Sequence, residues 1–248
     1  MKPLLWLLLA SSTASASAIA IFSNGAFTGS PNVTNLSSVL TGQGHTTSTF
    51  SSTTNWTANL GAANLAIIPD LDADLFAALT PSQRTEIAAF VSSGRNLLVT
   101  GGTGNAADTN AFLNGIFGFS VIATGSAASS SLDNTAATGT PFAGGPATLP
   151  VTNQVFLHQN GSLPGGALNL YHNATDSAVW AKSFGSGNVV YLGYDWFSGS
   201  QASWDAVLGR AVTYTATDIP SNVPEPGALG LTAAALALAR LRSRPVRR

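Results

Sequence analysis

The 248-residue sequence has no cysteine, one methionine and three histidines. The absence of cysteine excludes a disulfide framework, a thiolate metal site and a cysteine nucleophile. Charge is also scarce, because only 8% of the residues are Asp, Glu, Lys or Arg, against about 25% in an ordinary soluble domain. Hydrophobic residues nevertheless make up 45% of the chain, so its composition is that of a folded protein and not of a disordered one.

The few charges are unevenly distributed. Between residues 19 and 222, four basic residues stand against ten acidic ones, which gives this part a net charge of −6. Such a body has no basic surface for nucleic acid, so nucleic acid is not expected among its partners. Half of the ten basic residues lie together at the C-terminal end: Arg240, Arg242, Arg244, Arg247 and Arg248. This asymmetry indicates a specialised tail.

Residues 1–18 have the order of a secretory signal peptide. Lys2 provides a positive start, an apolar run follows from Leu4 to Ala10, and Ala16-Ser17-Ala18 has the A-x-A form of a signal peptidase site. We therefore expect export through the Sec translocon and cleavage by signal peptidase near Ala18. The alternative is a buried first helix.

Residues 220–248 combine three features in a fixed order. Pro224-Glu225-Pro226 comes first, an apolar stretch begins at Gly227, and the arginine cluster ends the chain. A helix from Gly227 to Leu241 is about 22 Å long at 1.5 Å per residue, which is short for a ~30 Å hydrocarbon core. Because flanking arginines can snorkel and the bilayer can thin, we expect a short transmembrane helix in membrane lipid. The arginines are expected on the cytoplasmic side.

This tail resembles the PEP-CTERM sorting signal over Val223 to Arg248. The resemblance implies recognition by an exosortase, a membrane-embedded protease-transpeptidase of Gram-negative bacteria. It also implies an inner-membrane-anchored precursor that reaches the cell envelope or surface, associated with exopolysaccharide or biofilm matrix. Pro224, Glu225 and Pro226 are then a motif on which another enzyme acts, and they are not catalytic. The alternative is a plain membrane anchor with an incidental Pro-Glu-Pro.

Residues 19–219 are long enough for one domain with a real core, and strand and helix patterns alternate along them. The expected strands are residues 18–22, 45–51, 64–70 and 95–100, and the expected helices are residues 32–40, 80–93, 106–117 and 203–214. This alternation favours an α/β fold with a mostly parallel sheet and helices on both faces. Residues 120–149 are predicted to be an inserted loop or weak strands. Residues 177–184 and 188–194 suit an antiparallel hairpin at a sheet edge.

The body resembles the class I glutamine amidotransferase-like superfamily, including its ThuA-like branch. The likeness rests on the first strand, the helix that opens with Thr80-Pro81, the strand that ends at Gly101-Gly102, and the segment from Gly187 to Trp196. It implies a flavodoxin-like three-layer sandwich. Members that hydrolyse glutamine use a Cys-His-Glu triad, so the lack of cysteine excludes a glutaminase. We therefore favour a non-catalytic body.

Ligands of open α/β sheets bind beyond the carboxyl ends of the strands. Six residues near those ends form a candidate ligand rim: Asn24, Asp70, Gly101, Gly102, Asp195 and Trp196. An Asp–Trp pair is a suitable sugar platform, because an aromatic face stacks on sugar C–H groups while a carboxylate accepts hydrogen bonds from hydroxyls. Alternatively, both aspartates cap turns and the tryptophan is a packed anchor.

Other chemistries find less support in the sequence. Gly101 to Gly104 can cradle an anion, but the segment lacks the P-loop lysine, so a simple turn is favoured and no cofactor is expected. His45, His158 and His172 lack metal-ligand spacing, so no metal is expected. Three hypotheses follow: a non-catalytic surface protein that binds polysaccharide, a carbohydrate-active hydrolase with Asp70 and Asp195 as acid and base, and a passive spacer.

Overall fold

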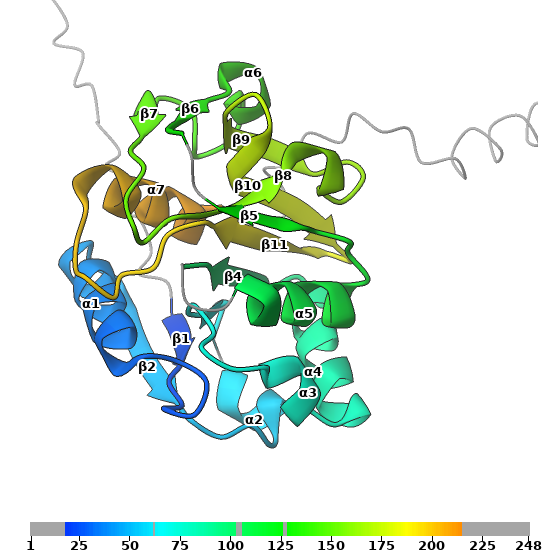
Figure 1. Ribbon diagram of the computed structural model, residues 1–248. Coiled ribbons are helices and arrows are strands. Elements are labelled where there is room, and N and C mark those ends of the chain that lie inside the picture. The colour runs from blue at the N-terminus through cyan, green and yellow to red at the C-terminus, as the bar shows by residue number, and fades with distance from the viewer. Residues whose placement is uncertain (1–17, 62, 103–105, 126–127, 215–248) are drawn as a thin grey trace, which may run out of the picture.

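Short apolar runs form the centre of the sheet in the computed structural model, which describes residues 18–61, 63–102, 106–125 and 128–214 (Figure 1). Five strands pair in parallel in the order β2-β1-β3-β4-β11. Their side chains are almost all buried except in the edge strand β2, because helices cover both faces of the sheet. The five strands are β1 (Ala18–Phe22), β2 (Thr46–Phe50), β3 (Leu65–Ile68), β4 (Asn96–Thr100) and β11 (Gly187–Leu192).

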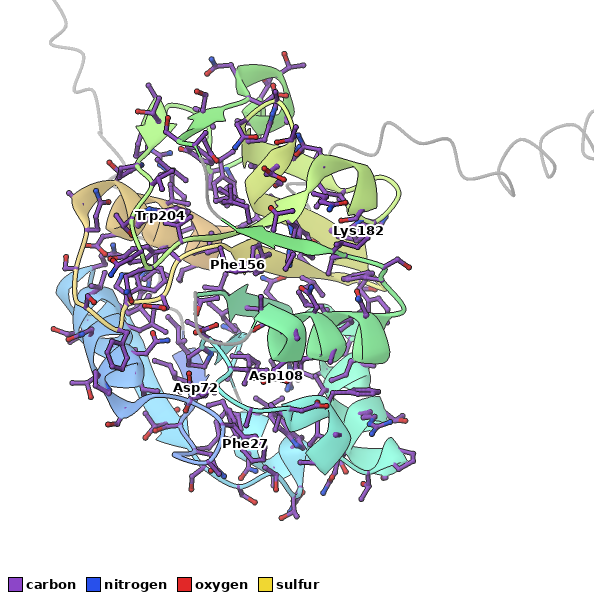
Figure 2. All side chains as sticks on the ribbon, viewed as in Figure 1. Phe27, Asp72, Asp108, Phe156, Lys182 and Trp204 are labelled. Carbon is purple, nitrogen blue, oxygen red and sulfur yellow. The ribbon has the colours of Figure 1, made fainter. Side chains whose placement is uncertain are left out.

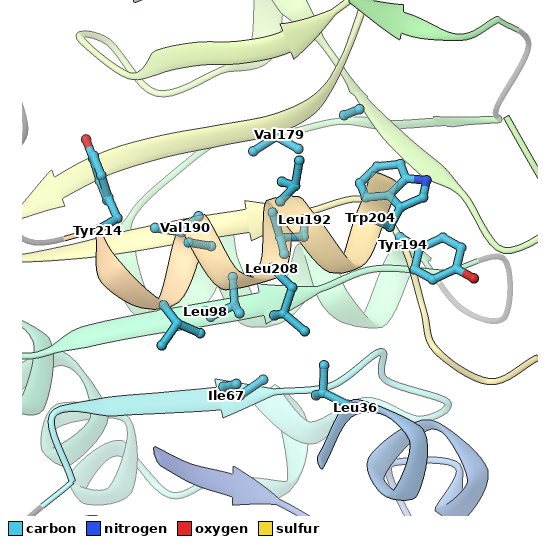
Figure 3. Packing of buried hydrophobic residues seen from close by; sticks show 14 of the residues in the cluster. Leu36, Ile67, Leu98, Val179, Val190, Leu192, Tyr194, Trp204, Leu208 and Tyr214 are labelled. Carbon is cyan, nitrogen blue, oxygen red and sulfur yellow. The ribbon is translucent and has the colours of Figure 1, made fainter. Parts of the chain in front are cut away.

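Two helices, α1 (Ser30–Gly42) and α7 (Ala202–Thr213), cover one face of these strands (Figure 1). Figure 3 shows Trp204 and Leu208 of α7 packed over the strands, with Leu36 of α1 beside them. All three side chains are fully buried. This packing fixes the loop between β11 and α7, which carries part of the site.

The opposite face is covered by four helices: α2 (Trp56–Leu60), α3 (Leu75–Ala78), α4 (Pro81–Ser92) and α5 (Ala106–Phe117). Helix α4 begins where the sequence predicts, because Thr80 and Gln83 form a capping box. The Thr80 backbone N–H donates to Gln83 Oε1 (2.7 Å) and the Gln83 N–H donates to Thr80 Oγ1 (3.4 Å). These bonds satisfy two backbone N–H groups that have no hydrogen-bond partner within the first turn of the helix.

Beyond β11 the sheet becomes antiparallel. Strand β11 pairs with β10 (Asp176–Phe184), and the sheet continues through β9 (Leu168–His172) and β6 (Ser130–Leu132) to β7 (Thr148–Leu149). Strand β8 (Phe156–Gln159) pairs with β10 and with β5 (Ala123–Gly125). Two short helical segments complete this half: α6 (Asn134–Ala137) and the 3-10 turn η1 (Asn160–Ser162).

The expected flavodoxin-like sandwich with a mostly parallel sheet is therefore wrong. The sheet is mixed and has 11 strands, and six antiparallel pairings outnumber four parallel ones among the described strands. The predicted hairpin is antiparallel, but it lies between β4 and β9 and not at an edge. The error arises between residues 120 and 172. There the short strands β8 and β9 pair with the long strand β10, and β5 and β6 pair with β8 and β9 in turn.

The sequence also predicts a transmembrane helix. The described residues contain no helix whose length and apolar character would let it cross a bilayer. The segment expected to form it, Gly227–Leu241, lies outside the described residues. The same holds for Pro224-Glu225-Pro226, for the arginine cluster and for residues 1–17 of the predicted signal peptide.

Candidate functional site

The loops that follow β3, β4 and β11 meet at one end of the parallel strands. Asp70 follows β3, Gly101 and Gly102 follow β4, and Asp195 follows β11. Parallel strands end at the same edge of a sheet, so their loops converge there. At this end lies an open cleft of about 270 Å³, to which the start of α1 and the segment before β8 also contribute. It is lined by Gly29, Asn32, Asp70, Asp72, Gln154, Asp195 and Phe197.

Gly102 lies between the carboxyl groups of Asp70 and Asp195. A methyl group on its Cα would lie 2.7 Å from Asp70 Oδ2 and would overlap Asp195 Oδ2 even more. Both oxygens therefore lie within 2.7 Å of one point, and their separation cannot exceed the ~5–5.5 Å spacing of paired carboxyl groups in retaining glycosidases. Glycine is required here because any larger side chain would push the two carboxyl groups apart.

Strand β4 holds the Asp70 carboxyl group in place. The Asp70 backbone N–H donates to Thr100 Oγ1 (3.0 Å), and the Gly102 N–H donates to Asp70 Oδ1 (2.8 Å). Thr100 is fully buried and Asp70 is only 5% exposed. The second oxygen of Asp70 faces Asp195, on the other side of Gly102.

Asp195 is held by the segments on both sides of it. The Phe197 N–H donates to Asp195 Oδ1 (2.9 Å), and the Asp195 N–H donates to the Gln154 carbonyl oxygen (3.1 Å). With its nitrogen turned toward the carboxylate, the Gln154 side-chain amide donates to Asp195 Oδ2 (3.2 Å). Asp195 is only 4% exposed, so its position is fixed before any ligand binds.

Burial makes both carboxyl groups weak acids. It raises the pKa of Asp70 to about 7, with a further rise from the charge of Asp195 that the Gly102 N–H partly opposes. Burial also raises the pKa of Asp195 to about 6, against the hydrogen bond from the Phe197 N–H. Two full charges about 5 Å apart repel by about 3 kcal/mol at an effective dielectric constant near 20. Near neutral pH, the pair therefore tends to keep one proton.

Phe197 forms an aromatic rim of the cleft. Its side chain is 53% exposed, and its ring covers Gly29, where an added Cβ would lie 3.3 Å from the ring and 3.5 Å from Asp72 Oδ2. The backbone beneath is anchored, because Asn35 Nδ2 donates to the Trp196 carbonyl oxygen (2.8 Å). An exposed ring on a fixed backbone is suited to contact with a ligand.

Asp72 and Asn32 complete the lining. The Asp72 N–H donates to the Phe27 carbonyl oxygen (2.8 Å), and Figure 2 labels these two residues in neighbouring loops. Asn32, in the first turn of α1, accepts a hydrogen bond from the Trp196 N–H at Oδ1 (3.1 Å). The cleft thus contains three carboxyl groups and two amides.

Of the six residues of the predicted rim, only Asp70 and Asp195 line the cleft. Gly102 lies between their carboxyl groups, and the other three lie elsewhere. Trp196 is fully buried; its Nε1–H donates to Asp205 Oδ1 (2.8 Å) and its ring meets Tyr194 edge-on at 5.0 Å. The Asn24 side chain holds a turn by accepting from the Ala26 N–H (3.0 Å). Gly101 lies against the Tyr191 hydroxyl. The structure brings together Asp70, Gly102 and Asp195.

Sequence reasoning missed five residues that line the cleft: Gly29, Asn32, Asp72, Gln154 and Phe197. Two of them had a usable signal, because Asp72 and Phe197 each come two positions after a predicted site aspartate. Gln154 had none, since it precedes a strand that the pattern did not reveal. Asn32 lies in a helix that the sequence predicts from the spacing of its apolar residues, and this spacing says nothing about a polar side chain.

The histidines do not contribute to the cleft. His158 is buried away from the cleft lining, where Trp180 Nε1–H donates to His158 Nδ1 (2.9 Å) and His158 Nε2 lies 2.8 Å from Asn110 Oδ1. Since an indole can only donate, the imidazole proton sits on Nε2, and burial lowers the pKa of His158 to about 3. This histidine is a neutral structural group. No three His, Asp or Glu side chains of the described residues are placed to hold a metal ion.

Comparison with known proteins gives a likeness of fold. No family profile and no curated protein matches the sequence. Among solved structures, a putative ThuA-like protein from Bacteroides uniformis is 14% identical, with a TM-score of 0.54 over 82% of this chain and 94% of that one. A cytoplasmic protein from Salmonella typhimurium is also 14% identical, with a TM-score of 0.57 over 81% and 99%. The body therefore has a ThuA-like fold, and the predicted resemblance is confirmed at that level.

A third likeness is to part of a larger enzyme. An exo-beta-1,4-mannosidase from Opitutaceae bacterium strain TAV5 is 12% identical, with a TM-score of 0.53 over 79% of this chain but only 36% of that one. At such identities the comparisons show the fold alone, so function must be argued from the cleft.

The raised pKa of Asp70 predicts that Asp70→Asn alters the pH dependence of stability. The carboxyl group has a pKa of 3.8 when unperturbed and about 7 in the folded protein, so the folded state binds the extra proton and the wild type loses stability as pH rises through this window. Asparagine does not titrate. Relative to the variant, the wild type should lose about 2–4 kcal/mol between pH 4 and pH 8, measured by urea denaturation.

Asp108→Asn on α5, outside the cleft, is the comparison. Burial also raises the pKa of Asp108, but this residue is only half-buried, so its variant should change the pH profile less than Asp70→Asn does. Parallel profiles for wild type and Asp70→Asn would show that the Asp70 carboxyl group titrates normally.

Proposed function

We propose that the protein is an exported binding protein whose cleft holds a saccharide unit. The observation that carries this proposal is the convergence of two buried carboxyl groups, Asp70 and Asp195, next to the exposed ring of Phe197. Carboxylates accept hydrogen bonds from sugar hydroxyls, and a ring at the rim can stack on the C–H face of a pyranose.

The size and rigidity of the cleft support a small ligand. Its volume of about 270 Å³ lies just below the ~300–1,000 Å³ of pockets for drug-sized molecules, so one sugar unit of a longer chain suits it. Both carboxyl groups are fixed by backbone donors. A preformed site loses little conformational entropy on binding.

Phe197→Ala should weaken binding of the best oligosaccharide from a glycan array by about 3–10-fold, because stacking on one ring contributes ~0.5–1.5 kcal/mol. Titration calorimetry measures the change. Ile122→Ala is a matched control, since Ile122 is equally exposed at 52% and does not line the cleft. If the wild type binds no glycan on the array, the saccharide proposal fails and the passive spacer is favoured.

A carbohydrate-active hydrolase is the second candidate. The two carboxyl groups are too close for the ~6.5–9.5 Å spacing of an inverting glycosidase, so the scheme is a retaining one, in which one carboxyl group protonates the leaving oxygen and the other attacks the anomeric carbon. Asp70 has the higher pKa, so it is the acid in this scheme and Asp195 the nucleophile. Raised and separated pKa values are typical of such pairs.

This candidate predicts turnover of an aryl glycoside by the wild type. Asp70→Asn and Asp195→Asn should each lower kcat/KM by at least about 100-fold, because general acid–base catalysis contributes roughly 10²–10⁴-fold. Phe197→Ala should act mainly through KM. A panel of aryl glycosides with no turnover above buffer would reject the hydrolase and leave the binding protein in place.

We further propose that residues 1–18 direct export through the Sec translocon and that the C-terminal segment is a sorting signal read by an exosortase. The support is the order of Pro224-Glu225-Pro226 and the arginine cluster in the sequence. The low charge of the body and its richness in uncharged polar residues suit an exported domain of a Gram-negative bacterium.

Replacing Pro224, Glu225 and Pro226 by alanine should leave the full-length precursor unprocessed in a host that has an exosortase. Immunoblotting of cell fractions measures the size and location of the protein. Ser221→Ala, just before the motif, is the control and should be processed normally. Normal processing of the triple variant would refute the sorting signal.

A further inference from the structure

The carboxyl pair of the cleft has no basic side chain beside it among the described residues. Neither Asp70 nor Asp195 forms an ion pair, and the one ion pair in the described part of the chain joins His172 to Asp133 (3.5 Å). The four basic residues of the body instead donate to backbone carbonyls: Arg84 to Phe76, Arg95 to Gly61, Lys182 to Gly165, and Arg210 to Pro141, Ala143 and Gly144.

Buried carboxyl groups are normally paired with cations or hydrogen-bond donors. Asp70 and Asp195 are both more than nine-tenths buried, and among the described residues the donors to Asp70 are only the backbone N–H groups of Gly102 and Leu71. The cleft also contains Asp72. Since water-filled clefts with low-dielectric walls focus the field of such groups, a positively charged ligand is attracted here and an anionic sugar is repelled.

We propose that the ligand of the cleft is an amino sugar whose protonated amine sits between Asp70 and Asp195, with its ring against Phe197. This inference rests on the proposed saccharide-binding function and names the sugar class. It excludes uronic acids and sulfated or phosphorylated sugars as the preferred ligands.

An ammonium group fits this arrangement better than a hydroxyl does. It has three donors and no acceptor, so it can satisfy both Oδ2 atoms around Gly102 at once, and charge-assisted hydrogen bonds are about twice as strong as neutral ones. Phe197 can then contact the C–H face of the same sugar, or its ring face can lie against the ammonium group. The Gly102 Cα keeps both oxygens close enough to share one donor group.

Three matched β-1,4-linked trisaccharides test the inference, because they differ mainly in one substituent at carbon 2. Cellotriose carries a hydroxyl, the glucosamine trimer an ammonium and the N-acetylglucosamine trimer a neutral amide. At about pH 7 and low salt, the full-length protein should bind the glucosamine trimer at least tenfold more tightly than either neutral trimer. About 0.5 M NaCl should reduce that advantage.

Asp195→Asn and Asp70→Asn should each lower the preference for the glucosamine trimer over cellotriose to threefold or less. Asp108→Asn is the control and should keep the full preference. Circular dichroism establishes that each variant is folded, and two independent variants keep the test decisive if one is not.

The outcomes separate the two proposals. Equal or tighter binding of cellotriose overturns the amino-sugar inference and leaves the saccharide-binding function standing. A preference that survives both asparagine variants also overturns the inference, since the ammonium then lies elsewhere. Failure of all three trimers to bind overturns the inference, and failure of the whole glycan array overturns the proposed function as well.

Discussion

The parallel pairing of β4 with β11 is the interaction on which the rest of the structure depends. It joins the parallel half of the sheet to the antiparallel half, with five residue pairs from Asn96–Asn188 to Thr100–Leu192. This register carries both strands out of the sheet at the same level, so that Gly102 meets Asp195. A shift by one residue would turn the buried side chains of β11 to the wrong face and would separate the carboxyl pair.

Two opposing effects act on the charges of the carboxyl groups in the cleft. Burial disfavours the charge on Asp70 and Asp195, while backbone N–H groups of Gly102 and Phe197 favour it. The result is a pair of carboxyl groups that change charge near neutral pH and have fixed positions. The same arrangement can bind a cation or exchange a proton with a substrate, which is why a binding protein and a hydrolase both follow from it.

The sequence predicted the elements with strong local signals and missed those that depend on distant partners. The capping box at Thr80 and the apolar run of β3 are properties of neighbouring residues, and both were predicted within a few positions. Strands β8 and β9 are short and are stabilised mainly by pairing with β10, so their own residues carry little pattern. The site divides in the same way: Asp70 and Asp195 follow recognisable strands, whereas Gln154 reaches Asp195 only through the unpredicted half of the sheet.

The late position of β11 in the chain also constrains the order of folding. Asn188 and Asn96 share a hydrogen bond across 92 positions, so β4 has a free apolar edge until nearly the whole body has been synthesised. Contacts of such long range close slowly, and an unpaired edge invites association with other chains. The sheet of the body is therefore completed only after β11 has left the ribosome. A chain that stays unfolded until then does not present the free edge of β4 in a partly folded sheet.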